Sequence, residues 1–214
     1  MSILSSANVR YVMIIYKIAE TVQERELAFR FAYNEYFNHG YIDAEKFPSK
    51  IMKDCFDSRP DSWTLIAIDD HSILGTIRMV RNCPSFSYGL PLERSFNLSA
   101  LPERGEKLGE VCRFACFNRK LVAYYLMKAV IKLAQHVGTT HFVISCSALK
   151  AHHYIDRFSF KQVGEPYYYE GIVCEHQSVT LFANIEKIIS DAPIVNPLFA
   201  RIFRKKDRNL LIPP

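Results

Sequence analysis

The feature that most constrains this fold is an apolar segment near the middle of the chain that contains two opposite charges. Residues 107–117 are mostly apolar and indicate a strand, and Glu110 and Arg113 interrupt it. An isolated charge in a buried strand is too unfavourable to persist, so each side chain needs a partner. Because strict alternation places residues 110 and 113 on opposite faces of a strand, a site shared by the two requires a β-bulge within residues 110–114.

The hydrophobic periodicity on either side of this segment predicts an alternation of strands and helices. Thr21 and Glu24 have capping-box spacing at the start of a helix over residues 20–38, and Gly138 ends a second helix over residues 119–137 that Asn118 caps. This order favours an α/β protein with a mixed, mostly antiparallel sheet flanked by helices. We expect strands over residues 9–18, 63–68, 73–80, 107–117, 141–145, 160–170 and 177–184, a third helix over 149–158, and irregular segments over 39–61 and 82–106.

The length of 214 residues favours one domain, residues 1–190, followed by a basic tail, residues 191–214. The net charge is +5, and residues 201–208 supply five basic residues against one acid. A disordered end, a docking helix and a membrane-surface contact are all compatible with such a tail. No segment has the length of a membrane span, and the apolar run at 11–16 is too short for a signal peptide, so we expect a cytoplasmic protein.

Six cysteines are scattered through the expected strands and loops. In a chain without an export signal, we expect them to stay reduced. Cys112 and Cys116 are four residues apart on one strand, but no second Cys or His pair completes a zinc site. We therefore interpret the cysteines as small buried apolar side chains and expect no metal.

Charged residues outside the central segment can be grouped with Glu110 and Arg113. Together they make three positive and three negative residues, which is enough for a neutral buried cluster. Taken singly, each residue fits an exposed position that has no role better than it fits a functional site. The six residues are Arg30, Asp54, Asp57, Arg78, Glu110 and Arg113.

The order of these six residues resembles the pattern of acyl-homoserine lactone synthases, which share the GNAT acyltransferase fold. Those synthases have an Arg on the first helix, an Asp-x-x-Asp pair, an Arg in the next strand and a Glu-x-x-Arg on the central strand. This sequence departs from them at Asn34 and Gly40–Tyr41, where they carry aromatic residues that hold the lactone-forming substrate. It is more similar to the N-acyl amino acid synthase family, which shares this core and the His-rich helix, aromatic turn and Gly-Glu strand entry of residues 151–167.

The resemblance implies an N-acyltransferase that moves a long-chain fatty acyl group from acyl carrier protein to the amine of an amino acid. GNAT enzymes that use acetyl-CoA bind its pyrophosphate with a glycine-rich loop, and residues 117–122 contain no glycine. A carrier protein's acyl-phosphopantetheine has no such pyrophosphate, so we expect it to be the donor, with no separate cofactor. An acidic carrier protein favours basic residues near the cleft, and the candidates are Arg119, Lys120, Lys128, Lys132 and Lys150.

The reaction that fits these residues is direct aminolysis of the thioester. Glu110, acting through a water molecule, accepts the proton of the attacking amine, while Arg113 orients Glu110. Arg30 and Arg78 are the candidates to hold the carboxylate of the acceptor, and the alternative for each is that Asp54 and Asp57 already pair with its guanidinium. Two alternatives stay open, an acyl-homoserine lactone synthase and a non-catalytic module that binds acyl carrier protein.

Overall fold

The computed structural model describes residues 13–70, 72–83, 85, 89–103, 105–117, 120–169 and 177–212. Its strands are β1 (Ile15–Ile18), β2 (Ser62–Ile68), β3 (Ile73–Arg81), β4 (Leu108–Cys116), β5 (His141–Ser147), β6 (Lys161–Tyr167), β7 (Ser178–Asn184) and β8 (Leu210–Leu211). Its helices are α1 (Val22–Asn38), α2 (Lys120–His136), α3 (Ala151–Phe158), α4 (Ile185–Val195) and α5 (Pro197–Arg204). Short 3₁₀ turns include η2 (Cys55–Ser58) and η3 (Pro91–Arg94).

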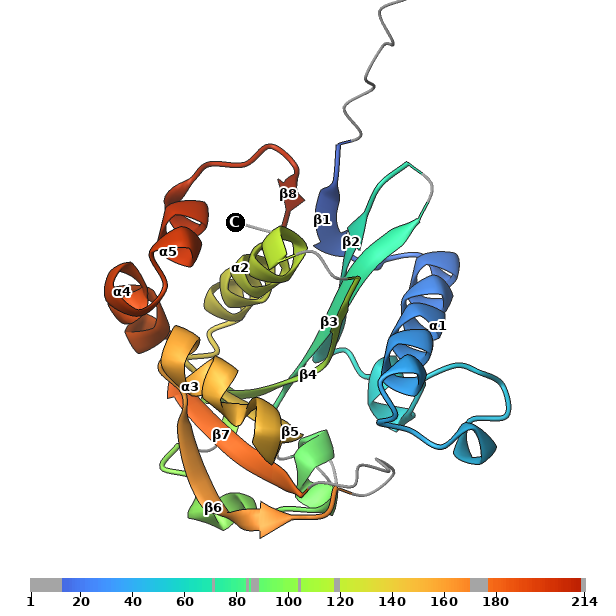
Figure 1. The fold of residues 1–214 in the computed structure, drawn as a ribbon, viewed down its shortest axis with the longest axis horizontal. Helices are drawn as coiled ribbons and strands as arrows, with labels where there is room; N and C mark the ends of the chain where they lie inside the picture. The colour runs from blue at the N-terminus through green and yellow to red at the C-terminus, as the bar shows by residue number, and fades with distance from the viewer. Residues whose placement is uncertain are drawn as a thin grey trace, which may run out of the picture.

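The described strands form one eight-stranded sheet in the order β6-β7-β5-β4-β3-β2-β1-β8. The pairs β4–β5 and β1–β8 are parallel, and the others are antiparallel. Helix α1 covers one face of the sheet and α2 covers the other (Figure 1). The expected mixed, mostly antiparallel sheet between helices is therefore present.

Two apolar clusters hold the two faces of the sheet to their covering elements. The larger lies between the sheet and α2, where Leu126, Val130 and Leu133 are buried. The smaller lies on the opposite face, where Leu90 and Leu92 of the η3 region cover Val80 and Leu108. Because both faces of β3 and β4 are covered, a charged side chain on either strand is withdrawn from water.

Local sequence signals set several element ends. The Thr21 hydroxyl accepts from the Glu24 N–H at 3.1 Å and the Glu24 carboxylate accepts from the Thr21 N–H at 3.2 Å, which confirms the capping box. Gly138 has a φ of +77° and follows α2, as predicted. The first strand begins later than predicted, at Ile15; residues 9–12 and the proposed cap Asn118 lie outside the described residues.

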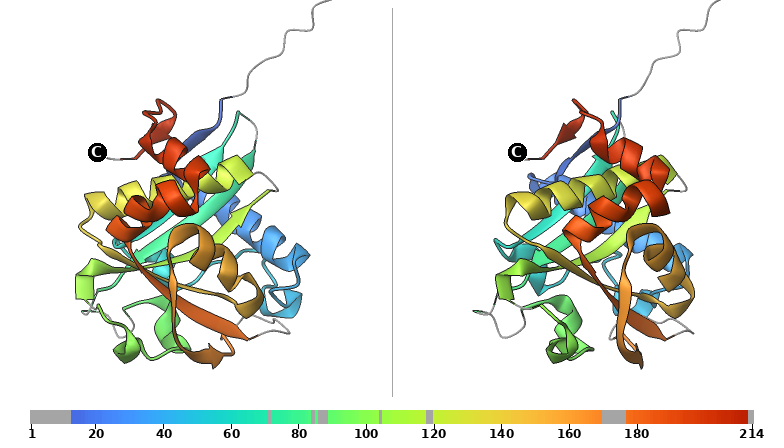
Figure 2. Two further views of the ribbon diagram at one scale, coloured as in Figure 1. Left: turned by 60° about the vertical axis from the view of Figure 1, so that its left-hand side comes forward. Right: turned by 90° about the vertical axis from the view of Figure 1, so that its left-hand side faces the viewer.

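The C-terminal region is helical and packed. Helix α4 runs through the boundary that we drew between residues 190 and 191. Helix α5 buries Phe199 and Ile202 on the side of α2 that faces away from the sheet (Figure 2), and β8 adds a strand beside β1. Within the described part of the chain, no helix is both long and apolar enough to cross a membrane.

Candidate active site

A β-bulge in β4 brings Arg113 to the face of the sheet on which Glu110 lies. Arg78 pairs with Cys112 and Thr76 pairs with Ala115, so two residue steps on β3 face three on β4. Arg113 has a φ of 51°, in the left-handed region, and takes up part of the extra length. The bulge that we expected within residues 110–114 is confirmed.

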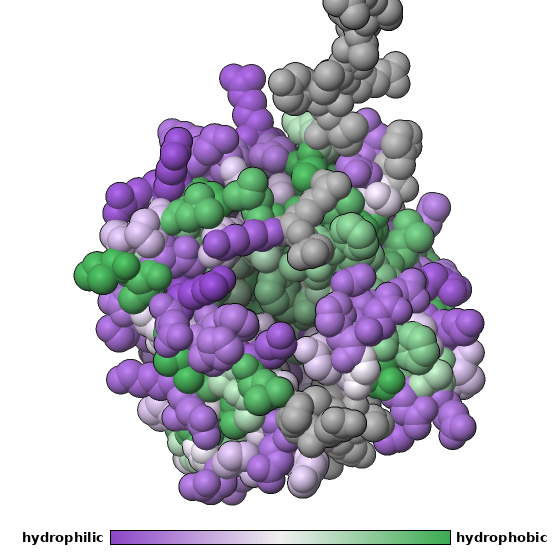
Figure 3. Space-filling view, viewed as in Figure 1, coloured by the Kyte–Doolittle hydropathy of each residue, from purple (hydrophilic) through white to green (hydrophobic). Residues whose placement is uncertain are grey.

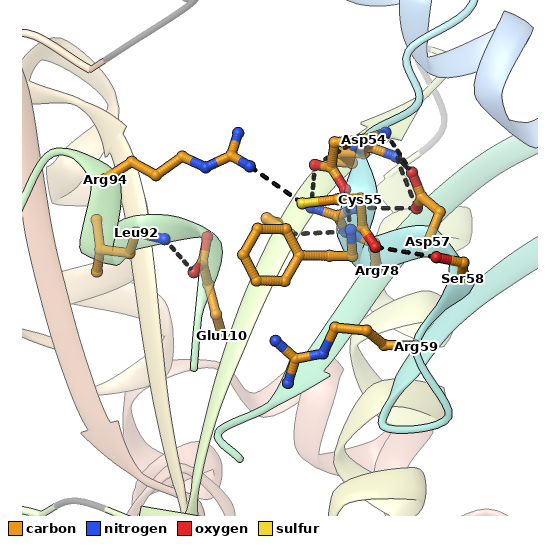
Figure 4. Close-up of polar contacts among 12 residues, drawn as sticks. Asp54, Cys55, Asp57, Ser58, Arg59, Arg78, Leu92, Arg94 and Glu110 are labelled. Carbon is orange, nitrogen blue, oxygen red and sulfur yellow. Dashed lines mark hydrogen bonds and ion pairs between the residues drawn. The ribbon is translucent and has the colours of Figure 1, made fainter. Parts of the chain in front are cut away.

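Four of the six predicted charges form one compact network. Arg78 donates from Nη1 to Asp54 Oδ1 at 2.8 Å and to Asp57 Oδ1 at 2.9 Å. Arg113 lies 2.8 Å from Asp54 Oδ2 through Nη2 and 2.8 Å from Asp57 Oδ2 through Nη1. The two aspartates cap η2 together, because the Asp54 N–H donates to Asp57 Oδ2 at 2.7 Å (Figure 4). The network contains two cations and two anions and is therefore neutral.

Each charged group of the network is paired with an opposite charge inside the network. Burial alone would raise the pKa of Asp54, but the guanidinium groups of Arg78 and Arg113 lower that pKa to about 2. Arg78 is 3% exposed and both of its guanidinium NH₂ groups face carboxylates. It is thus already paired and does not present a free guanidinium to an acceptor carboxylate.

Arg30 does not join this network, which corrects our expectation. Its guanidinium lies 2.8 Å from Glu26 on the same helix, and the Arg30 side chain is 48% exposed. The helical turn between neighbouring residues is about 100°, so when Phe29 is buried against the sheet, Arg30 points outward. The position next to Arg113 is occupied instead by the Phe29 ring, 5.7 Å from the guanidinium.

Glu110 is a buried carboxyl group that stands apart from the network. It is 1% exposed, and its Oε2 accepts from the Leu92 N–H of η3 at 2.7 Å (Figure 4). Burial raises the pKa of Glu110 to about 7, even though the hydrogen bond from Leu92 favours the ionised form. A carboxylate with such a pKa is matched to accepting a proton near neutral pH.

Strands β4 and β5 pair only at their beginnings and then separate. Their register runs from Leu108 opposite His141 to Glu110 opposite Val143, so Glu110 stands where the fork opens. A cavity of about 460 Å³ occupies the opening, within the size range of small-molecule sites. Val111, Cys112 and Arg113 line it, whereas Glu110, the residue that precedes Val111 on β4, does not.

The inner wall of the cavity is apolar. Met127 of α2 and Phe142 of β5 are both fully or almost fully buried, and Phe160 closes the same region. The mouth opens on the face seen in Figure 3, where apolar surface is set back between hydrophilic groups. A cavity with this lining fits a molecule that has a long apolar part and a polar end.

The sequence model of the N-acyl amino acid synthase FeeM matches residues 27–183, most of the chain. This chain belongs to the FeeM family. It is accordingly an acyltransferase of the N-acyl amino acid synthase type, as the resemblance implied. No curated protein sequence matches it significantly.

Solved structures extend the comparison to the fold. FeeM from uncultured soil microbes superposes with a TM-score of 0.69 at 22% identity, over 89% of this chain and 98% of that one. The CoA-dependent acyl-homoserine lactone synthase BjaI gives 0.63 at 13% identity, over 88% and 89%. An acyl-CoA N-acyltransferase from Pseudomonas aeruginosa gives 0.54 at 17% identity, over 80% and 98%. The predicted GNAT-type acyltransferase fold is confirmed.

Cationic side chains surround the mouth of the cavity in this FeeM-family chain. Lys120 and Lys150, two of the predicted carrier-protein contacts, are exposed and line the cavity. Arg157 lines it as a further cation and His153 as an imidazole whose pKa burial lowers, and we predicted neither as a site residue. Their spacing from Lys150, three and seven residues, was the signal that was available, because it places all three on one side of a helix. Arg119 lies outside the described residues.

Lys128 is a buried structural residue, which corrects its assignment as a carrier-protein contact. Its ammonium lies 2.6 Å from Asp207 and donates to the carbonyl oxygens of Ile202 at 2.9 Å and Lys205 at 2.5 Å. Both charged side chains are 3% exposed because α5 and the following turn cover this side of α2. Lys132, one turn further on, lies over the Phe203 ring at 4.9 Å and does not line the cavity.

Three cysteines, Cys112, Cys116 and Cys146, line the cavity as neutral thiols, and burial also raises the pKa of Cys116. Burial raises the pKa of Cys112 and of Cys146 to about 12. Arg78 Nε also donates to Cys112 Sγ at 3.2 Å. Thiols in this state are poor nucleophiles, which favours direct transfer over a covalent acyl-cysteine. Within the described ranges, no three His, Cys, Asp or Glu side chains are arranged to hold a metal ion.

Proposed function

We propose that this FeeM-family acyltransferase transfers a long-chain fatty acyl group from acyl carrier protein to the amine of an amino acid. The observation that carries the proposal is the apolar cavity in the β4–β5 fork, with a cationic mouth at one end and Glu110 at the base of the fork. The acyl chain occupies the apolar wall near Met127 and Phe142. The thioester then lies beside Cys112 and Arg113 on β4.

The reaction proceeds by attack of the neutral amine on the thioester carbonyl carbon. A C–N bond forms, the C–S bond breaks, and the amine proton passes through a water molecule to Glu110 and on to the departing thiolate. The water is needed because Glu110 lies behind the cavity wall rather than in it. Arg113 and Phe114 have no register partner on β3, so their N–H groups are candidates to stabilise the oxyanion.

A carrier protein is the donor that best fits the mouth of the cavity. Lys120, Lys150 and Arg157 form no ion pair with another described residue, so their charges are available to an acidic partner. The absence of glycine from residues 117–122 also favours an arm without a pyrophosphate. The fold does not decide the donor, because enzymes described as CoA-dependent share it.

The acceptor amine enters from the side of α1. Glu35, Tyr36 and His39 line the cavity there, beside Arg113. Arg30 points to solvent and Arg78 is already paired, so neither remains the expected ligand of the acceptor carboxylate. Arg157, which also lines the cavity, takes that role in the proposal.

The test compares donors that carry the same acyl chain. Purified protein is incubated with acyl carrier protein thioester or with the corresponding acyl-CoA, each with a mixture of amino acids, and products are measured by mass spectrometry. We expect N-acyl amino acid from the carrier-protein donor at a kcat/KM at least tenfold above that of acyl-CoA.

Variants separate donor recognition from chemistry. Lys120→Glu combined with Lys150→Glu should raise KM for the carrier-protein donor and leave kcat nearly unchanged, whereas Glu110→Gln should lower kcat by about a hundredfold or more. Equal use of both donors would overturn the carrier-protein assignment. A lactone formed from S-adenosylmethionine, or no turnover with any amine, would overturn the reaction itself.

A further inference from the structure

An apolar corner projects from the surface where α4 meets α5. Within residues 193–198 every side chain but one is exposed, and Ile194 is 85% exposed. The exception is Asn196, whose Oδ1 accepts from the Phe199 N–H and so caps α5. Figure 3 shows apolar side chains gathered at the edge of the molecule over α4. The exposed residues of the corner are Pro193, Ile194, Val195, Pro197 and Leu198.

A basic stripe continues from this corner along α5. Leu198, Arg201 and Arg204 follow one another at three-residue spacing and are all exposed, so they share one side of the helix. Lys205, Lys206 and Arg208 extend the stripe beyond its end. The acid of this segment, Asp207, is buried against Lys128. Within residues 197–208, the exposed charged side chains are therefore all positive.

The corner adjoins the mouth of the cavity. Asn196 Nδ2 donates to the carbonyl oxygen of Arg157 at 3.5 Å, and the Arg157 side chain lines the cavity. Ser159, just beyond α3, donates to Asp191 of α4 at 2.7 Å. These contacts fix the apolar corner relative to the opening through which an acyl chain passes.

We propose that the apolar corner and the basic stripe dock this protein on the surface of an anionic lipid bilayer. Exposed apolar side chains that project together enter the boundary between headgroups and acyl chains, and neighbouring arginines and lysines are attracted to anionic lipids. A convex corner with projecting Ile194 and Leu198 fits a deformable lipid surface. The exposed residues of the corner are uncharged, and the positive charges of the stripe complement the negative charge of the lipid headgroups. Docking places the mouth of the cavity beside the phase into which a long-chain product partitions.

Vesicle binding by the full chain tests the proposal. The protein is sedimented with vesicles of phosphatidylcholine alone and with vesicles that also contain phosphatidylglycerol. We expect binding to the anionic vesicles, weakened by added salt. The pairs Ile194→Glu with Leu198→Glu and Arg201→Glu with Arg204→Glu should each lower the partition coefficient by about tenfold or more.

The matched control alters exposed apolar residues on the other side of the sheet. Val22→Glu combined with Leu27→Glu on α1 should bind like the wild type, and thermal midpoints should show that all variants fold. Equal binding to neutral vesicles, or wild-type binding by either α5 pair, overturns the proposal. So does a dimer that the Ile194 and Leu198 changes dissociate, or a loss of carrier-protein binding without a loss of vesicle binding.

Discussion

Replacing Glu110 by glutamine tests whether burial of this proposed base destabilises the folded protein near neutral pH. In the folded protein, burial raises the pKa of Glu110 from 4.5 to about 7. Between these two pH values, the folded state keeps a proton that the unfolded state has released. The contribution of this group to stability is therefore fully present below about pH 4.5 and is lost as the pH rises to about 7. A difference of about 2.5 pKa units corresponds to about 3 kcal/mol.

Urea unfolding of the two proteins at both ends of this window measures the effect. Relative to the wild type, E110Q should gain about 3 kcal/mol between mildly acidic and mildly alkaline pH, or about 1.5 M in the urea midpoint at a slope of about 2 kcal/mol/M. Turnover should show the opposite sign, because only the ionised carboxylate accepts a proton. Wild-type kcat should rise with pH up to about 7 and then level.

The exposed residue Glu165 on β6 supplies the control. The unfolding free energy of E165Q should follow the wild type across the whole pH range. If E110Q also ran parallel to the wild type, the carboxyl group would not be protonated in the folded protein near neutral pH. The assignment of Glu110 as a base adjusted by burial would then fail.

Three further predictions follow from the network and the cavity. D57N leaves two buried guanidinium groups against one carboxylate and should lose about 3–5 kcal/mol in denaturant unfolding, whereas E26Q, which breaks the exposed pair with Arg30, should lose less than about 1 kcal/mol. Because the pKa of Asp54 is lowered to about 2, its contribution to stability should persist above about pH 4 and disappear toward pH 2, and D54N should lack this acid transition. A123L fills part of the cavity and should shift kcat/KM toward shorter acyl donors, by about fourfold for each methylene excluded.

Features that depend on neighbours in sequence were predictable. The capping box of α1 needs only Thr21 and Glu24, and Gly138 marks the end of α2 by its own backbone freedom. The bulge followed from one condition, that Glu110 and Arg113 share a face. The turn η2 was not predictable in the same way. Asp54 and Asp57 have the spacing of a helix cap, but the turn that they cap is too short to show a hydrophobic periodicity.

Features that depend on how one helix packs against another element were not predictable from the same patterns. The sequence pattern places both Lys128 and Lys132 on the solvated face of α2. In the structure, α5 covers Lys128 and leaves Lys132 partly exposed. The composition of residues 201–208 gave no sign that Asp207 would turn inward to meet Lys128. The prediction for Arg30 was wrong for a related reason. The order of charges along the chain does not tell which side of α1 faces the sheet.

The separation of the buried charges keeps the Glu110 carboxyl group suited to the role of base that we propose for it. Had Arg78 or Arg113 been unpaired on this face, its charge would have lowered the pKa of Glu110 toward the ordinary range and weakened the carboxylate as a proton acceptor. Asp54 and Asp57 neutralise both cations at distances of 2.8–2.9 Å, so burial remains the largest influence on Glu110. The two aspartates thus act on the base through the charges they remove from its surroundings, and this requires no contact with the substrate.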